Sequence, residues 1–67
     1  MKDFSAYSDE RLMTDRNHTY NHMRKIENRA TRRGGFSLSE DIQLTALAER
    51  HDDLTREAFN RKLLVVI

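Results

Sequence analysis

The sequence predicts a small all-α protein, built either as a helical hairpin or as a three-to-four-helix unit. Its 67 residues include no Pro and only two Gly, so little in the chain interrupts helices or supplies the turns of a many-stranded fold. Apolar side chains recur at helical spacing in two long stretches, and the two glycines stand together between them. Serines followed by acidic residues precede each stretch, as at many helix N-termini.

The first helix is predicted over residues 9–33. Ser8 is its expected N-cap, because a serine hydroxyl can accept a hydrogen bond from a free amide of the first turn. Asp9 and Glu10 then suit the positive end of the helix dipole. Arg16 interrupts the apolar stripe of this helix, whose members are Leu12, Tyr20 or Thr19, Met23, Ile26 and Ala30.

Gly34 and Gly35 are predicted to join this helix to a second one. Glycine adopts, at little steric cost, the left-handed backbone conformation that commonly ends a helix. The preceding Arg32 and Arg33 suit the negative end of the helix dipole. We therefore expect the first helix to end at this pair.

The second helix is predicted over residues 38–63. Ser37 and Glu40 have the spacing of a capping box, in which each side chain bonds the other residue's backbone amide, although Ser39 is a competing N-cap. The pair Asp52-Asp53 could kink the helix or divide it in two. Its apolar stripe consists of Leu44, Leu47, His51, Leu54 and Ala58, flanked by Ile42, Ala48 and Phe59.

The chain is expected to form one domain over residues 1–67, with a thin core. Domains of this size bury only about 60% of the surface that the unfolded chain exposes, and such a core contributes roughly 3–5 kcal/mol. Without Cys, neither a disulfide nor a thiolate metal site can add to that stability. We therefore expect a homodimer or a heteromeric complex, with the apolar tail Leu63–Ile67 packed on the hairpin or on a second chain.

Several features favour a cytoplasmic protein that does not contact membranes. The segment Met1–Tyr7 carries Lys2 and Asp3 and no apolar run, unlike a secretory signal. The longest apolar run, Leu63–Ile67, is far too short to cross a bilayer. The absence of Cys fits a reducing compartment.

Charge is distributed unevenly along the chain. Residues 1–33 contain eight Lys or Arg and five Asp or Glu, whereas residues 34–67 contain four and six. Within residues 16–33 the counts are six basic and one acidic. The first half is therefore a basic arm and the second half an acidic one, which bears on the choice of binding partners.

The basic arm is the candidate site for DNA or RNA. Most of its basic residues are spaced three or four apart and therefore share one stripe of the helix. Lys and Arg side chains neutralise backbone phosphates, so the arm suits phosphate contact more than base reading. An ordinary solvated helix face is the alternative interpretation. The predicted nucleic-acid-binding residues are His18, His22, Arg24, Lys25, Arg29, Arg32 and Arg33.

Glu49, Asp52 and Asp53 form the predicted partner-binding surface, which would suit a basic protein; a solvated face is again the alternative. We expect no enzymatic activity, because two thin helices cannot easily enclose a catalytic pocket and no nucleophile or phosphate-loop motif occurs. His18 and His22 lie four apart on one helical face, but no third ligand completes a metal site. Neither a metal nor another cofactor is therefore expected.

Several stretches of the chain look like segments of a known family. Phe36–Leu44 resembles the pattern aromatic-x-Leu-Ser/Thr-Asp-x, and His51-Asp52 and Leu54–Arg61 look like Ala-Asp-His-Arg and Asn-Lys. Leu12-Met13 and Met23–Glu27 are similar to Leu-Met and Leu-Glu-Arg-Val-Ile. In these segments and in length, the chain resembles the Hha/YmoA family of enterobacterial gene-expression modulators.

The resemblance implies a small helical protein without enzymatic activity. It implies binding to the N-terminal region of the histone-like nucleoid structuring protein, and assistance in silencing genes on DNA. Asp52 would match the family's acidic residue that pairs with a basic residue of that partner. The chain departs from the family in its longer connection through Arg33–Gly35 and in lacking a C-terminal Pro and Trp tail. Residues that replace acids of the family's partner-facing helix are Asn21, Arg24 and Asn28.

These features favour a DNA-binding or RNA-binding regulator of transcription, or one that binds a nucleoid or transcription protein. Two alternatives stay open. The first is a protein–protein adaptor or inhibitor from a phage or plasmid, with no nucleic-acid contact. The second is a homodimeric hairpin that binds structured RNA by shape.

Overall fold

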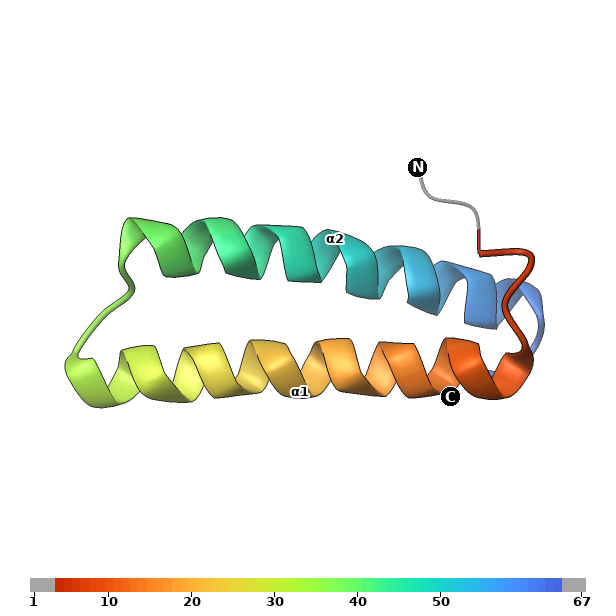
Figure 1. Cartoon of the computed structure of the whole chain (residues 1–67), viewed down its shortest axis with the longest axis horizontal. Coiled ribbons are helices and arrows are strands. Elements are labelled where there is room, and N and C mark those ends of the chain that lie inside the picture. The colour runs from red at the N-terminus through yellow and green to blue at the C-terminus, as the bar shows by residue number, and fades with distance from the viewer. Residues whose placement is uncertain (1–3, 65–67) are drawn as a thin grey trace.

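The computed structural model describes residues 4–64, which form two helices side by side (Figure 1). Helix α1 spans Asp9–Arg33 and helix α2 spans Leu38–Asn60. The helices run antiparallel and join at the Gly34-Gly35 turn, so the predicted all-α hairpin is confirmed. No third helix occurs within residues 4–64, so the three-to-four-helix alternative is not seen there.

The helix starts follow the predicted caps. The Ser8 hydroxyl accepts a hydrogen bond from the Arg11 amide at 3.1 Å. Ser37, rather than Ser39, is the N-cap of α2, because its hydroxyl accepts from the Glu40 amide at 3.2 Å. The Ser37 amide in turn donates to the Glu40 carboxylate at 2.9 Å, which completes the capping box.

Both helices end in the same hydrogen-bonding arrangement. At the end of α1, Gly34 has a φ of 95°, and the Gly35 amide donates to the Ala30 carbonyl at 2.9 Å. At the end of α2, Lys62 has a φ of 62°, and the Leu63 amide donates to the Ala58 carbonyl at 2.9 Å. Each is a Schellman closure, in which a left-handed residue turns the chain out of the helix.

The end of α2 corrects the predicted boundary, since the helix stops at Asn60 and does not reach residue 63. The closure uses Lys62, a residue that adopts the left-handed conformation only at a cost, so no glycine marks it in the sequence. The turn directs Leu63 and Leu64 back onto the hairpin, as expected for the tail; residues 65–67 lie outside the described residues. Helix α2 continues through Asp52-Asp53 without a break.

The apolar core lies at the end of the hairpin opposite the Gly34-Gly35 turn. Phe4, Leu12, Leu54 and Ala58 are buried there together. The partly buried residues that pack against this cluster are Tyr7, Met13, Leu63 and Leu64. Toward the turn, Ile26 and Ala30 are the buried apolar residues of α1.

The middle of the helix–helix contact is polar. Thr19 is buried and Tyr20 is 47% exposed, which settles the alternative left open by the periodicity. Arg16, which interrupts the predicted stripe, donates to the Thr55 hydroxyl of α2 at 2.9 Å. His51 is half-buried, with its ring centre 6.0 Å from that of Tyr20.

Two predicted flanking residues of the α2 stripe, Ile42 and Phe59, are exposed instead of covered. Both lie toward the helix face opposite Leu47 and Leu54, so a hairpin of two helices has nothing to pack against them. The apolar stripe of α2 is accordingly narrower than the sequence suggested.

Arg61 ties the segment before α1 to the end of α2. Its guanidinium donates to the carbonyl groups of Phe4 at 2.9 Å and Tyr7 at 2.7 Å, and to the Asp9 carboxylate at 3.0 Å. A further hydrogen bond joins it to Glu57 of the same helix at 2.9 Å. The hydrogen bonds to Glu57 and then to Asp9 raise the pKa of Arg61 above its usual value. Arg61 thereby holds the buried Phe4 ring in the core.

Arg61→Ala should lower the melting temperature, measured by circular dichroism, by on the order of 10 °C, because Phe4 and Tyr7 lose their common donor. Arg61→Lys should lower it almost as far, since an ammonium group cannot reproduce the several donors of a planar guanidinium. Arg56→Ala is the matched control, because Arg56 is an exposed arginine of α2 with no ion pair inside the described part of the chain. The control should shift melting by about 2–4 °C at most. Equal melting of Arg61→Ala and wild type would contradict this role.

Candidate nucleic-acid interface

The fold separates the basic residues into those with partners and those without. Arginines at both ends and in the middle of the hairpin are engaged with other residues: Arg11 with Asp15, Arg16 with Thr55, Arg33 with Glu40, Arg50 with Asp15, and Arg61 with Asp9 and Glu57. Within residues 4–64, no hydrogen bond or ion pair engages the side chains of Arg24, Lys25, Arg29 or Arg32. The unengaged cations therefore concentrate in the C-terminal half of α1.

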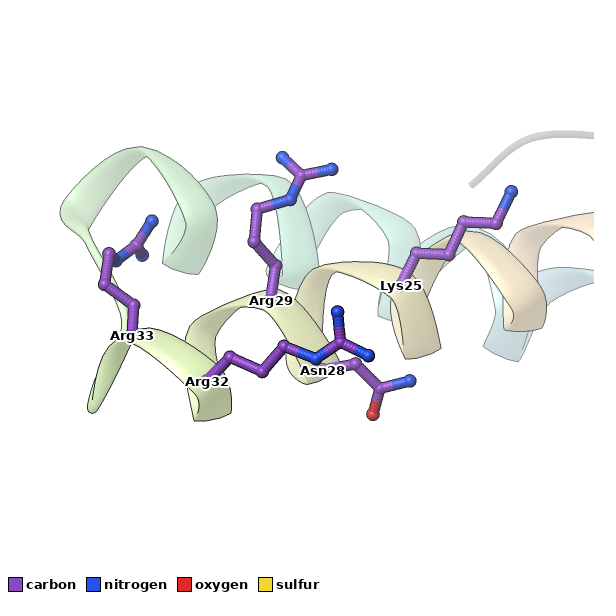
Figure 2. A pocket seen from close by; sticks show the side chains of 5 residues that line it. All are labelled: Lys25, Asn28, Arg29, Arg32 and Arg33. Atoms are coloured by element: carbon purple, nitrogen blue, oxygen red, sulfur yellow. The ribbon is translucent and has the colours of Figure 1, made fainter.

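Side chains of this half of α1 surround an open hollow of about 530 Å³. Figure 2 shows that they all rise from α1, with the ends of Lys25 and Arg29 directed to the same side. The helical repeat explains the grouping, because residues three or four apart stand on one face. The hollow is lined by Lys25, Asn28, Arg29, Arg32 and Arg33, which we call the cationic surface.

Arg33 serves the turn as well as this surface. Its guanidinium donates to the Glu40 carboxylate and to the Gly35 carbonyl, the latter at 3.3 Å. Glu40 is only 8% exposed and is the residue that closes the capping box of α2. The Arg33 side chain remains about half exposed, so part of it still faces solvent beside Arg29 and Arg32.

The structure does not bring all seven predicted residues to one place. His18 and His22 line a separate hollow of about 230 Å³ between the helices, together with Asp15, Thr19, Leu47 and Arg50. Arg24 is exposed but is not among the residues that line either hollow. Asn28, which is not among the seven predicted residues, does line the cationic surface.

The predicted acidic surface lies on α2. Glu49, Asp52, Asp53 and Arg56 line an open hollow of about 340 Å³. Glu49 and Asp52 are exposed and Asp53 is half-buried. None of the three carboxylates forms an ion pair with a residue in the described range. The acidic surface is therefore formed by α2 alone and is open to solvent.

Sequence reasoning missed a group of exposed apolar residues where α2 begins. Phe36, Leu38 and Ile42 are 54%, 77% and 62% exposed. In the sequence, Ile42 is expected to flank the apolar stripe of the second helix, and no pattern marks Phe36 or Leu38 as exposed. Leu38 and Ile42 share a face of α2 against which no third helix of residues 4–64 packs, and Phe36 lies in the connection just before that helix.

The chemistry available at these surfaces is ionic. The cationic surface offers guanidinium and ammonium donors in an open, solvated hollow, an arrangement that suits phosphate oxygens. In residues 4–64, no three His, Cys, Asp or Glu side chains gather to hold a metal ion. Neither of the two described helices is long and apolar enough to span a membrane.

The chain matches no protein-family model, no curated protein and no solved structure.

Substitution of Arg33 and of Arg32 tests whether the first arginine stabilises the fold and the second does not. Arg33→Ala should lower the free energy of unfolding in urea by about 1 kcal/mol, because it removes a charged donor from the largely buried Glu40 carboxylate. Arg32→Ala removes the same charge one residue earlier and should change that free energy by less than about 0.5 kcal/mol. Similar costs for the two variants would show that the Arg33–Glu40 contact does not stabilise the turn.

Proposed function

We propose that the protein is a small non-enzymatic regulator that associates with nucleic acid by contacting backbone phosphates through the cationic surface. The observation that carries the proposal is the sorting of the basic residues. Those elsewhere in the hairpin are largely engaged in structural contacts, while Lys25, Arg29 and Arg32, which have no ion pair or side-chain hydrogen bond within residues 4–64, gather around one open hollow. None of the residues that line this hollow is acidic. An ordinary solvated helix face commonly mixes both signs of charge, whereas a phosphate-binding surface excludes carboxylates.

The spacing of these cations fits a phosphate backbone. Lys25 and Arg32 lie seven positions apart, which is about 10 Å along a helix. One strand of duplex DNA carries a phosphate about every 3.4 Å of the helix axis, so this length spans about three phosphate steps. Binding of this kind follows charge and backbone geometry and carries little information about base sequence.

Two further features favour a regulatory role. Phosphate contact without base reading suits a protein that modulates expression at many sites or alongside a DNA-binding partner. The resemblance of Phe36–Leu44 and of His51-Asp52 to Hha/YmoA segments supports the same class. A nucleoid-structuring protein that presents basic residues would then be a suitable partner for Glu49, Asp52 and Asp53.

The acidic surface also supports a second candidate function, that of a protein–protein adaptor without nucleic-acid contact. The observation that favours this function is the open hollow on α2, which is lined by Glu49, Asp52, Asp53 and Arg56. Carboxylates without partners in such a hollow suit the lysines and arginines of another protein. In this case the cationic surface would be a solvated face or would contact an acidic protein.

Salt dependence separates the two candidates. Binding of a fluorescent oligonucleotide, measured by anisotropy at several salt concentrations, should weaken with a logarithmic slope of about −0.9 per duplex phosphate contact, or about −0.7 on single strands. Arg29→Ala with Arg32→Ala should flatten that slope by about one unit per residue with little change in sequence preference. Helicity should be retained, because alanine is a strong helix former and both positions are exposed.

The matched control is Arg11→Ala with Arg56→Ala, which removes the same charge from exposed positions outside the cationic surface. Its slope should stay close to that of the wild type. No binding by the wild type at low salt, or equal flattening by both double variants, would remove the nucleic-acid proposal and favour the adaptor.

A further inference from the structure

Phe36 is an exposed aromatic residue of the connection between α1 and α2. It follows Gly35 in the short connection between the helices, three residues after Arg33, which lines the cationic hollow. Its side chain is 54% exposed. Within the described range, its ring has no aromatic or cation–π contact. Three residues span at most about 11 Å of chain, so an extended ligand on the cationic surface can also reach this ring.

The backbone on both sides of Phe36 is held in place. Before it, the Gly35 carbonyl accepts a hydrogen bond from the Arg33 guanidinium at 3.3 Å. After it, the Ser37 amide donates to the Glu40 carboxylate at 2.9 Å, and that carboxylate also binds Arg33. The exposed ring thus stands on a backbone fixed by the same arginine that lines the cationic surface, so little ordering entropy opposes its use in binding.

The start of α2 offers Phe36 no partner for a hydrophobic staple. An apolar residue just before the N-cap commonly packs against the residue at the fourth helical position, as a hydrophobic staple. Here Ser37 is the N-cap and the fourth helical position is Asp41, which is exposed and acidic. No staple forms, and the large exposed fraction of the Phe36 ring agrees with this.

We propose that Phe36 is a stacking platform for one base of a single-stranded nucleic acid whose backbone lies along the cationic surface. This inference rests on the proposed function and specifies the form of nucleic acid that the same site takes. Single-strand binding sites combine a cationic track for the backbone with aromatic rings on which bases stack. Bases of a duplex are already stacked on their neighbours, so an exposed ring adds affinity only for unpaired ones.

A tryptophan at position 36 reports on stacking directly. The chain contains no Trp, so Phe36→Trp introduces a single indole, whose fluorescence stacked bases quench. Short single-stranded DNA and RNA oligonucleotides should both quench it on binding. An abasic oligonucleotide of the same length, which keeps the phosphates but lacks bases, should bind without quenching. Phe59→Trp places an indole at another exposed phenylalanine position, at the far end of α2, and should not be quenched.

Affinity gives the second readout. Phe36→Leu keeps an apolar side chain but removes the ring, and should weaken single-strand binding about 5- to 150-fold, the range found for loss of one base–aromatic stack. The salt slope should stay unchanged, because no phosphate contact is lost, and duplex affinity should stay unchanged as well. RNA and DNA arms run in parallel show whether the sugar affects the site.

Three results would overturn the stacking proposal: unchanged single-strand affinity of Phe36→Leu, equal loss on single strands and duplex, or equal quenching by the abasic oligonucleotide. If Arg29→Ala with Arg32→Ala still flattens the salt slope in those cases, the proposed phosphate contact stands and only the role of Phe36 fails. If the wild type binds neither form at low salt, both proposals fail together.

Discussion

The contact of Arg33 with Glu40 is the interaction that holds together the end of the hairpin at the Gly34-Gly35 turn. It joins the last residue of α1 to the first turn of α2 and leaves the Glu40 carboxylate shared between the Arg33 guanidinium and the Ser37 amide. The carboxylate is largely buried, so these charged and capping hydrogen bonds count for more than they would on the surface. The turn and the backbone on both sides of Phe36 are held by this one junction.

The hairpin places its packing and its candidate binding chemistry at different ends. Apolar burial is concentrated around Leu12 and Leu54, near the termini, where Arg61 fastens the segment that carries Phe4. Toward the turn, burial thins to Ile26 and Ala30, and polar closures hold the chain instead. Substitutions of the exposed cations should therefore change nucleic-acid binding without changing the stability of the core.

The sequence predicted the features that local chemistry determines and missed those that depend on the partner helix. Ser8, Gly34 and the Ser37–Glu40 box were read correctly because caps and left-handed glycines are specified by neighbouring residues. The end of α2 was placed three residues too late because its closure uses Lys62, whose side chain gives no sign of a positive φ. The grouping of Lys25, Arg29 and Arg32 followed from helical periodicity. The contact of Arg33 with Glu40 could not be predicted in this way, because Glu40 belongs to α2. Nor could the position of His18 and His22 away from the cationic surface, since they line a hollow that α2 completes.

Chemical-shift mapping on the isotopically labelled protein tests the central claim most directly, because it locates the contact without altering any residue. Titration with a short single-stranded oligonucleotide at low salt should shift the backbone amides of residues 24–36 most strongly. The amides around Glu49 and Asp52, and those of the core near Leu12 and Leu54, should move little. Shifts centred on the acidic surface of α2, or spread evenly over both helices, would contradict the assignment of the cationic surface as the nucleic-acid interface.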